Sequence, residues 1–111
     1  MITEYQMAAT VDQLPGGRIL SVEVAGESIC LAHIGDEYFA INNICTHMYT
    51  RLDQGQFYPA TCEIECPLHD SRFNFITGMP TKPPADEPVA TYPVRVEGDH
   101  ILVGPRKEHP A

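Results

Sequence analysis

Two short pairs of metal-ligating side chains stand out in this chain. The first is Cys45-Thr46-His47, and after 18 intervening residues the second is Cys66-Pro67-Leu68-His69. Two thiolates and two imidazoles suit zinc in a Cys₂His₂ site, or a [2Fe–2S] cluster with two cysteines on one iron and two histidines on the other. Zinc fingers usually pair cysteine with cysteine and histidine with histidine. The spacing favours the cluster, because each short pair here holds one residue of each kind.

The two pairs resemble the ligand set of Rieske iron–sulfur proteins, and the residues around them agree. The agreeing residues are Leu52 and Gly55, then Ser71-Arg72-Phe73 and Thr77-Gly78-Met79-Pro80, and finally the segment Pro88 to Val94, which is similar to the strand after the family's proline-rich loop. The resemblance covers nearly the whole chain. Within the family, the chain is most similar to the small, free-standing Rieske ferredoxins of bacterial oxygenase systems.

The resemblance implies a cofactor and a role. It implies one Rieske-type [2Fe–2S] cluster held by Cys45, His47, Cys66 and His69, in the ferredoxin component of a multicomponent aromatic-ring dioxygenase system. Such a protein is a one-electron carrier and not an enzyme. It takes electrons from an NAD(P)H-dependent flavoprotein reductase and delivers them to a terminal aromatic-ring oxygenase. The sequence holds no glycine-rich phosphate loop and no dinucleotide fingerprint, so the electrons must come from another protein.

Three residues next to the ligands bear on the reduction potential. In high-potential Rieske proteins each ligand loop carries an extra cysteine, and the two form a disulfide; Leu68 occupies one of those positions here. Those proteins also place a tyrosine hydroxyl near a ligand sulfur, where this chain has Phe73, whereas Ser71 matches a serine that can donate to a bridging sulfide. The resemblance therefore implies a midpoint in the low half of the family's range, roughly −150 to +50 mV.

Other assignments stay open at the level of sequence. A structural Cys₂His₂ zinc module would use the same four side chains, and an all-cysteine cluster would use Cys30, Cys45, Cys62 and Cys66. The all-cysteine set ignores both histidines, and the apolar segment around Cys30 is typical of a buried small residue. The chain could also be the small Rieske subunit of a larger oxidoreductase, such as a nitrite reductase.

Length and charge limit the function further. The chain has 111 residues, with 7 basic and 15 acidic side chains and a formal net charge of −8, so we expect a single domain over 1–111. Negative charge disfavours nucleic acid and anionic membrane surfaces and favours partners with basic docking patches. The sequence shows neither an apolar run of about 20 residues nor a basic-then-apolar leader. We therefore expect a cytoplasmic protein, most simply a monomer, without nucleic-acid or membrane partners.

The elements that must position the ligand pairs are predicted to be β-strands. Turn residues at 14–17, 35–36 and 98–99 separate runs rich in β-branched side chains. The predicted strands cover 3–9, 17–25, 28–34, 37–41, 61–65, 73–76, 89–97 and 100–103. Residues 79–84 are too rich in proline to pair in a sheet, and 105–111 are predicted to be a polar tail. The pattern predicts an all-β protein, a Rieske-type antiparallel β-sandwich or partial barrel with a small cluster-binding subdomain inserted at about 44–80.

Overall fold

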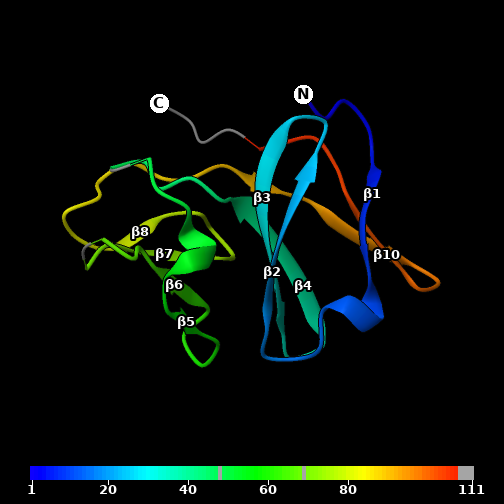
Figure 1. The fold of residues 1–111 in the computed structure, drawn as a ribbon, viewed down its shortest axis with the longest axis horizontal. Coiled ribbons are helices and arrows are strands. Elements are labelled where there is room, and N and C mark those ends of the chain that lie inside the picture. Colours follow the sequence, from blue (N-terminus) through cyan, green and yellow to red (C-terminus); the bar gives the residue numbers. More distant parts are fainter. Residues whose placement is uncertain (48, 69, 108–111) are drawn as a thin grey trace.

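The computed structural model describes residues 1–47, 49–68 and 70–107, and within them the chain forms antiparallel β-sheets (Figure 1). The strands are β1 (Gln6–Thr10), β2 (Ile19–Val24), β3 (Glu27–Ile34), β4 (Glu37–Asn42), β5 (Phe57–Tyr58), β6 (Glu63–Glu65), β7 (Arg72–Asn74), β8 (Pro80–Lys82), β9 (Thr91–Tyr92), β10 (Val94–Glu97) and β11 (His100–Val103). The helical elements of the described residues are two 3₁₀ turns, η1 (Val11–Gln13) and η2 (Leu52–Gln54). The predicted all-β class is confirmed.

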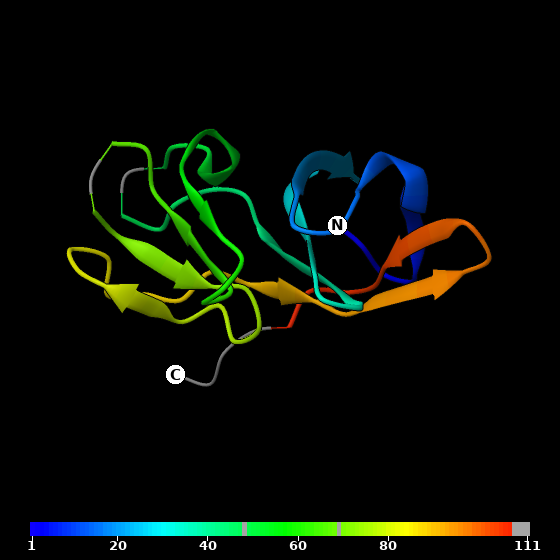
Figure 2. The same cartoon turned by 90° about the horizontal axis from the view of Figure 1, so that it is seen from below.

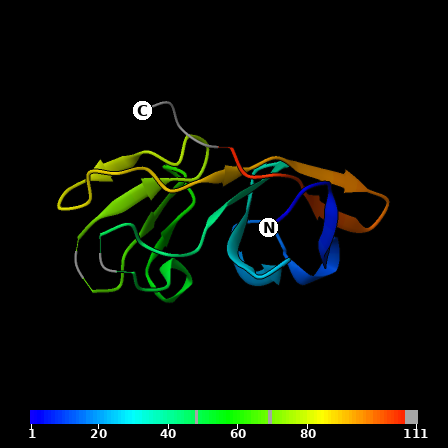
Figure 3. The ribbon, with the colours of Figure 1, turned by 90° about the horizontal axis from the view of Figure 1, so that it is seen from above.

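Three sheets make two halves of the molecule. The base sheets have the strand orders β2-β3-β4-β9 and β1-β11-β10, and they enclose one apolar core. The third sheet, β5-β6-β7-β8, is inserted between β4 and β9 and is termed the cluster sheet. Figures 2 and 3 show the cluster sheet as a lobe beside the base sheets. The insertion agrees with the predicted arrangement, while the predicted limits of 44 and 80 stay a prediction.

Strand β3 explains how the two halves share a wall. Successive side chains of a strand point to opposite faces, and here both faces are covered. Ile29 and Leu31 pack into the core of the base sheets. Cys30 and Ala32 pack into a second core against Ile64 and other side chains of the cluster sheet. The apolar run in β3 therefore lacks an apolar–polar alternation because the strand is buried on both sides.

Two predictions about proline-containing segments are wrong. Residues 80–82 do pair in a sheet: Lys82 lies opposite Arg72 and Pro80 opposite Phe73. Proline is tolerated at the first residue of an edge strand, where its missing N–H is not needed by a neighbour. The predicted strand 89–97 is in fact two strands separated by Pro93, of which β9 pairs with β4 and β10 with β11.

The C-terminal segment is ordered further than its polar composition indicates. The backbone N–H of Lys107 donates to the Thr91 carbonyl at 2.7 Å, and the Arg106 guanidinium lies 3.8 Å from Glu27 Oε1. The prediction of a polar tail is therefore wrong for 105–107, and 108–111 lie outside the described residues. In the described part of the chain, no helix is long and apolar enough to cross a membrane.

Candidate metal centre

The two predicted ligand pairs lie in loops that are closed in the same way. In the first ligand loop, residues 45–50, the backbone N–H of Cys45 donates to the Thr50 carbonyl at 2.8 Å. In the second ligand loop, residues 66–71, the N–H of Cys66 donates to the Ser71 carbonyl, also at 2.8 Å. A cysteine therefore stands at the base of each loop. Figures 2 and 3 show both loops at the end of the molecule away from the β10–β11 hairpin.

The described candidate ligands divide into buried thiols and an exposed imidazole. Cys45 and Cys66 are 0% and 1% exposed, and His47 is exposed in the first ligand loop. His69 lies outside the described residues. Among those described, no group of three or more His, Cys, Asp or Glu side chains is placed to hold one metal ion. A [2Fe–2S] cluster takes two protein ligands on each iron, and thiols supplied singly by two matching loops fit that requirement.

Gly55 brings the two ligand loops together. The residue follows η2, and its N–H donates to the Leu52 carbonyl at 2.9 Å. A Cβ atom at Gly55 would lie 1.7 Å from the Glu65 carbonyl oxygen, immediately before the second ligand loop. The φ of Gly55 is −94°, which any residue can adopt. Glycine is therefore needed here for close backbone approach and not for its conformational freedom.

The segment after β8 ties both ligand loops to one another. The Thr46 hydroxyl in the first ligand loop donates to the Glu87 carbonyl at 2.8 Å. In the second ligand loop, the buried Ser71 hydroxyl oxygen accepts from the Ala85 N–H at 2.8 Å. The hydroxyl predicted to tune the potential thus also has a structural partner. Residues 85–87 therefore contact both ligand loops.

The outer face of the cluster sheet carries a charged network that should make stability depend on pH. The Glu63 carboxylate accepts a hydrogen bond from the Thr81 hydroxyl and another from the Thr61 hydroxyl, the second at 2.7 Å. Arg72 Nη1 lies 3.6 Å from Glu63 Oε1. The pKa of Glu63 is held below its ordinary value, mainly by the hydrogen bond from Thr81 and next by the one from Thr61. Burial acts to raise this pKa, and the positive charge of Arg72 acts to lower it further. A lowered pKa in the folded state means that ionised Glu63 stabilises the fold above the unfolded pKa.

We therefore expect the free energy of unfolding to decrease as pH falls from about 5 toward 3, through the lowered pKa of Glu63. Urea titrations across this range should show a smaller decrease for Glu63→Gln than for the wild type, because glutamine cannot be protonated. The decrease includes other carboxylates, so only the difference between the two proteins reports on Glu63. Equal slopes for both would show that the network does not couple Glu63 to folding.

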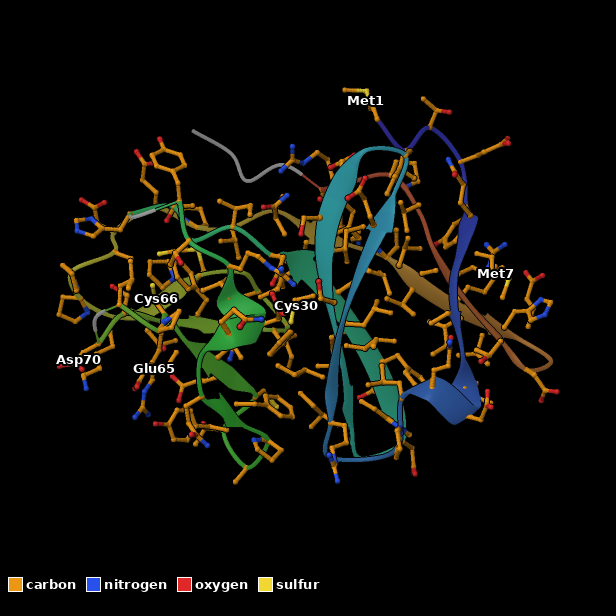
Figure 4. All side chains as sticks on the ribbon, in the orientation of Figure 1. Met1, Met7, Cys30, Glu65, Cys66 and Asp70 are labelled. Atoms are coloured by element: carbon orange, nitrogen blue, oxygen red, sulfur yellow. The ribbon has the colours of Figure 1, made fainter. Side chains whose placement is uncertain are left out.

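The remaining two cysteines are poorly placed as ligands. Cys30 is fully buried, as predicted, and it lies within strand β3 and not in a loop. Figure 4 places Cys30 between the two halves, apart from Cys66. Cys62 precedes β6 and Cys66 follows it, a separation of about 13 Å at roughly 3.3 Å per strand residue. These positions do not support the all-cysteine cluster.

Two residues beside the site escaped the sequence analysis. Asn43 is 0% exposed, two residues before Cys45, and its side-chain amide bonds Asp53 in η2 at 2.6 Å. A polar residue between the apolar strand β4 and the first ligand pair is the only sequence signal for this contact. The signal is weak, because exposed asparagine is common near turns.

The fold and the two matching loops define a class of small all-β protein with one buried cysteine at the base of each loop, and comparison with known proteins identifies the family. Residues 4–93 match the model of the Rieske [2Fe-2S] domain. The chain therefore belongs to the Rieske [2Fe–2S] domain family, as predicted, and its cofactor is a cluster of that type.

Known relatives cover nearly the whole chain. The ferredoxin component of the naphthalene 1,2-dioxygenase system of Pseudomonas aeruginosa is 35% identical, over 93% of this chain and 97% of its own. The biphenyl dioxygenase ferredoxin subunit of Pseudomonas sp. (strain KKS102) is 33% identical, over 89% and 90%. Among solved structures, the ferredoxin of carbazole 1,9a-dioxygenase from Nocardioides aromaticivorans IC177 superposes with a TM-score of 0.88 at 42% identity, over 93% of this chain and 99% of that one.

Two further solved structures are similar to this chain. A ferredoxin solved in complex with the oxygenase of carbazole 1,9a-dioxygenase has a TM-score of 0.87 at 27% identity, covering 97% of this chain and 99% of that one. A protein described as the small subunit of a putative NADPH nitrite reductase has a TM-score of 0.75 at 17% identity, over 89% and 96%. At that identity the second likeness shows a shared fold alone.

Proposed function

We propose that the chain is the electron carrier of a bacterial aromatic-ring oxygenase system. It takes single electrons from an NAD(P)H-dependent flavoprotein reductase and gives them to a terminal oxygenase, and it performs no bond chemistry itself. The main support is the match to dioxygenase ferredoxin components over almost their full length. The likeness to a ferredoxin bound to its oxygenase supports the direction of transfer.

The proposed protein ligands are Cys45, His47, Cys66 and His69, and the bound cluster supplies the one-electron chemistry. The chain's own task is to hold the two ligand loops at a fixed spacing and to keep the thiols away from water. Burial of Cys45 and Cys66 and the matched loop closures support this assignment. From Leu68 and Phe73 we still predict a reduction potential in the low half of the range of Rieske proteins.

The surface around the ligand loops fits a protein partner. Among the described residues of the two ligand loops, each loop exposes one large apolar side chain, Tyr49 at 81% and Leu68 at 63% exposure. Tyr49 also has a φ of 54°, a left-handed conformation that is strained for a bulky residue. A strained and exposed tyrosine gives the isolated protein no benefit, which supports a contact with a partner. We also expect Met48, the neighbour of Tyr49 in the first ligand loop, to touch partners, but this residue lies outside the described ones.

Unpaired negative charge lies in the second ligand loop and in the segment 85–87 that contacts both loops. Asp70, Asp86 and Glu87 are exposed, and none of them forms an ion pair with another described residue. Other carboxylates near the site are paired with arginine. Asp53 pairs with Arg51, and Glu63 and Glu65 on β6 pair with Arg72. We expect a partner surface with an apolar centre and a basic rim, and transfer that slows as ionic strength rises.

Substitutions in the loops should slow electron transfer without loss of the cluster. Tyr49→Gly removes the ring and relaxes the left-handed backbone, so we expect equal or higher stability together with about tenfold slower transfer, the loss typical of an interfacial aromatic residue. Leu68→Glu should slow transfer similarly. Stopped-flow reduction of the oxygenase by the reduced carrier measures both effects.

Matched controls separate docking from strain and from added charge. Ala25→Gly relieves a similar left-handed residue, with φ of 50°, in the turn between β2 and β3. Met7→Glu places a charge on an exposed apolar position of β1. Both should transfer electrons at the wild-type rate. Wild-type rates for Tyr49→Gly and Leu68→Glu as well would place the docking surface elsewhere.

The function itself is tested by reconstitution. The purified protein, NADH, a flavoprotein ferredoxin reductase and a terminal aromatic-ring oxygenase should together give hydroxylated product, and omission of this protein should stop its formation. A colourless protein that contains zinc and no iron would instead support the zinc module. Elution from native host extract as part of a large complex would support a small subunit of a larger oxidoreductase, against the predicted monomer.

A further inference from the structure

The buried polar residues of the structure gather beside the predicted ligands. Among the described residues, the buried polar side chains are Asn43 and Ser71, both 0% exposed. Asn43 lies two residues before the first ligand loop, and Ser71 is the last residue of the second. A buried amide lowers stability unless its donors and acceptor are hydrogen-bonded. Ser71 contacts the segment after β8, whereas Asn43 contacts two different parts of the fold.

One side of Asn43 is attached to the base sheets. Its backbone N–H donates to the Ser28 carbonyl on β3 at 3.0 Å. Its side-chain Nδ2 lies 3.2 Å from Ser28 Oγ and 3.4 Å from Ser21 Oγ on β2. Asn43 is therefore held by strands that belong to the larger half of the molecule, two residues before Cys45 of the first ligand loop.

The other side of Asn43 is attached to η2 by three hydrogen bonds. Nδ2 donates to Asp53 Oδ1 at 2.6 Å, and Oδ1 accepts from the Asp53 N–H at 2.9 Å. The Asn43 carbonyl accepts from the Leu52 N–H at 2.7 Å. A backbone N–H can only donate and a carboxylate can only accept, so one orientation of the amide satisfies both groups.

Asp53 is held in turn as a charged acceptor. Arg51 Nε and Nη2 donate to its two oxygens at 3.0 and 2.9 Å, in a bidentate pair. Burial acts to raise the pKa of Asp53, but hydrogen bonds from Asn43, Arg51 and Gln54 outweigh it and hold the pKa below the ordinary value. The carboxylate is therefore ionised at neutral pH and requires a donor at the position of Asn43 Nδ2.

Contacts continue from η2 to the second ligand loop. Gly55 follows η2 and abuts the Glu65 carbonyl, and the Glu65 N–H donates to the Gln56 carbonyl at 2.8 Å. We propose that Asn43 and Asp53 form a clamp that sets the spacing between the two ligand loops, so that the ligands of both loops can reach one cluster. Asn43 and Asp53 are thus positioning residues, and their role rests on the ligand set proposed above.

Exchanging the two side chains tests the clamp. Asn43→Asp places two carboxylates opposite each other. Asp53→Asn instead keeps an amide oxygen that can accept the hydrogen bond from Asn43 Nδ2. The double variant Asn43→Asp/Asp53→Asn restores one amide and one carboxylate in reciprocal contact, and the serine hydroxyls can donate to the new carboxylate. We expect Asn43→Asp to lower cluster loading about tenfold, the effect of losing a charge-assisted buried hydrogen bond. The double variant should load close to the level of Asp53→Asn.

The measurements are iron and acid-labile sulfide per chain after anaerobic reconstitution, and the electron paramagnetic resonance line shape of the reduced protein. Clusters that remain in Asn43→Asp should show an altered line shape, and the double variant should recover the wild-type one. Asn74→Asp is the control, because Asn74 Oδ1 only accepts from the N–H groups of Ile76 and Thr77, and aspartate can do the same. It should load and resonate like the wild type.

Two results would overturn the clamp. One is a double variant no better than Asn43→Asp, which would mean that the reciprocal contact is not what matters. The other is an Asn43→Asp protein with full loading and an unchanged line shape. Neither measurement involves a reductase or an oxygenase, so the clamp can fail while the proposed carrier function stands. Failure of the carrier function would appear only in the reconstituted hydroxylation.

Discussion

Serine in place of Cys45 or Cys66 should give a chain that binds little iron and lacks visible absorption. A serine hydroxyl is a poor substitute for a soft thiolate on iron, and each ligand loop has one cysteine at its base. We expect loss of nearly all iron and acid-labile sulfide in either variant. Cysteine in place of His47 should change the absorption spectrum, because a thiolate would replace a neutral ligand.

The other two cysteines supply matched controls for this prediction. Cys62→Ser removes a half-buried thiol from the opposite end of β6 and should leave iron, sulfide and spectrum intact. At the fully buried Cys30 we prefer alanine to serine, because a hydroxyl there would add an unpaired polar group to the core. Loss of the cluster in Cys62→Ser would show that the ligand set is wrong.

Alanine at Gly55 should prevent the two ligand loops from reaching their native spacing. The added methyl group would lie 1.7 Å from the Glu65 carbonyl oxygen, so one of two backbone segments must move. Overpacking usually costs about 1–3 kcal/mol. The cost at Gly55 should lie at or above the upper end of that range, because the methyl group would meet backbone atoms and not a flexible side chain. We expect a lower midpoint in urea unfolding, followed by far-UV circular dichroism, and loss of most bound iron.

Gly16→Ala is the matched control for Gly55→Ala. Its Cβ would approach nothing nearer than His33 Cε1 at 4.0 Å. Alanine there reduces the freedom of the unfolded chain, so we expect a change between zero and a gain of about 1 kcal/mol. A Gly55→Ala protein as stable and as fully loaded as Gly16→Ala would show that close approach at this point does not set the spacing of the loops.

The spacing of Cys45, His47, Cys66 and His69, together with the residues around them, was sufficient to predict the family and the cofactor. The all-β class was predicted separately, from turn residues and runs of β-branched side chains. Metal ligands are readable in a sequence because few residue types bind iron, and a loop that holds two of them needs short spacing. Turn residues marked most hairpins for a similar local reason, since glycine supplies conformations that other residues avoid. The ligand set itself remains a prediction, and His69 lies outside the described residues.

Only the tertiary structure decided what sets the spacing between the two ligand loops. Gly55 appeared in the sequence as part of a resemblance, but its purpose depends on a carbonyl ten residues away at Glu65. The contact of Asn43 with Asp53 likewise joins residues ten positions apart across a buried junction. The neighbouring strands also decide the roles of two prolines. Pro80 pairs with Phe73 at the edge of the cluster sheet, and Pro93 separates β9, which pairs with β4, from β10, which pairs with β11. Such contacts depend on which distant segments fold against each other, and the type of a single residue does not specify its distant partner.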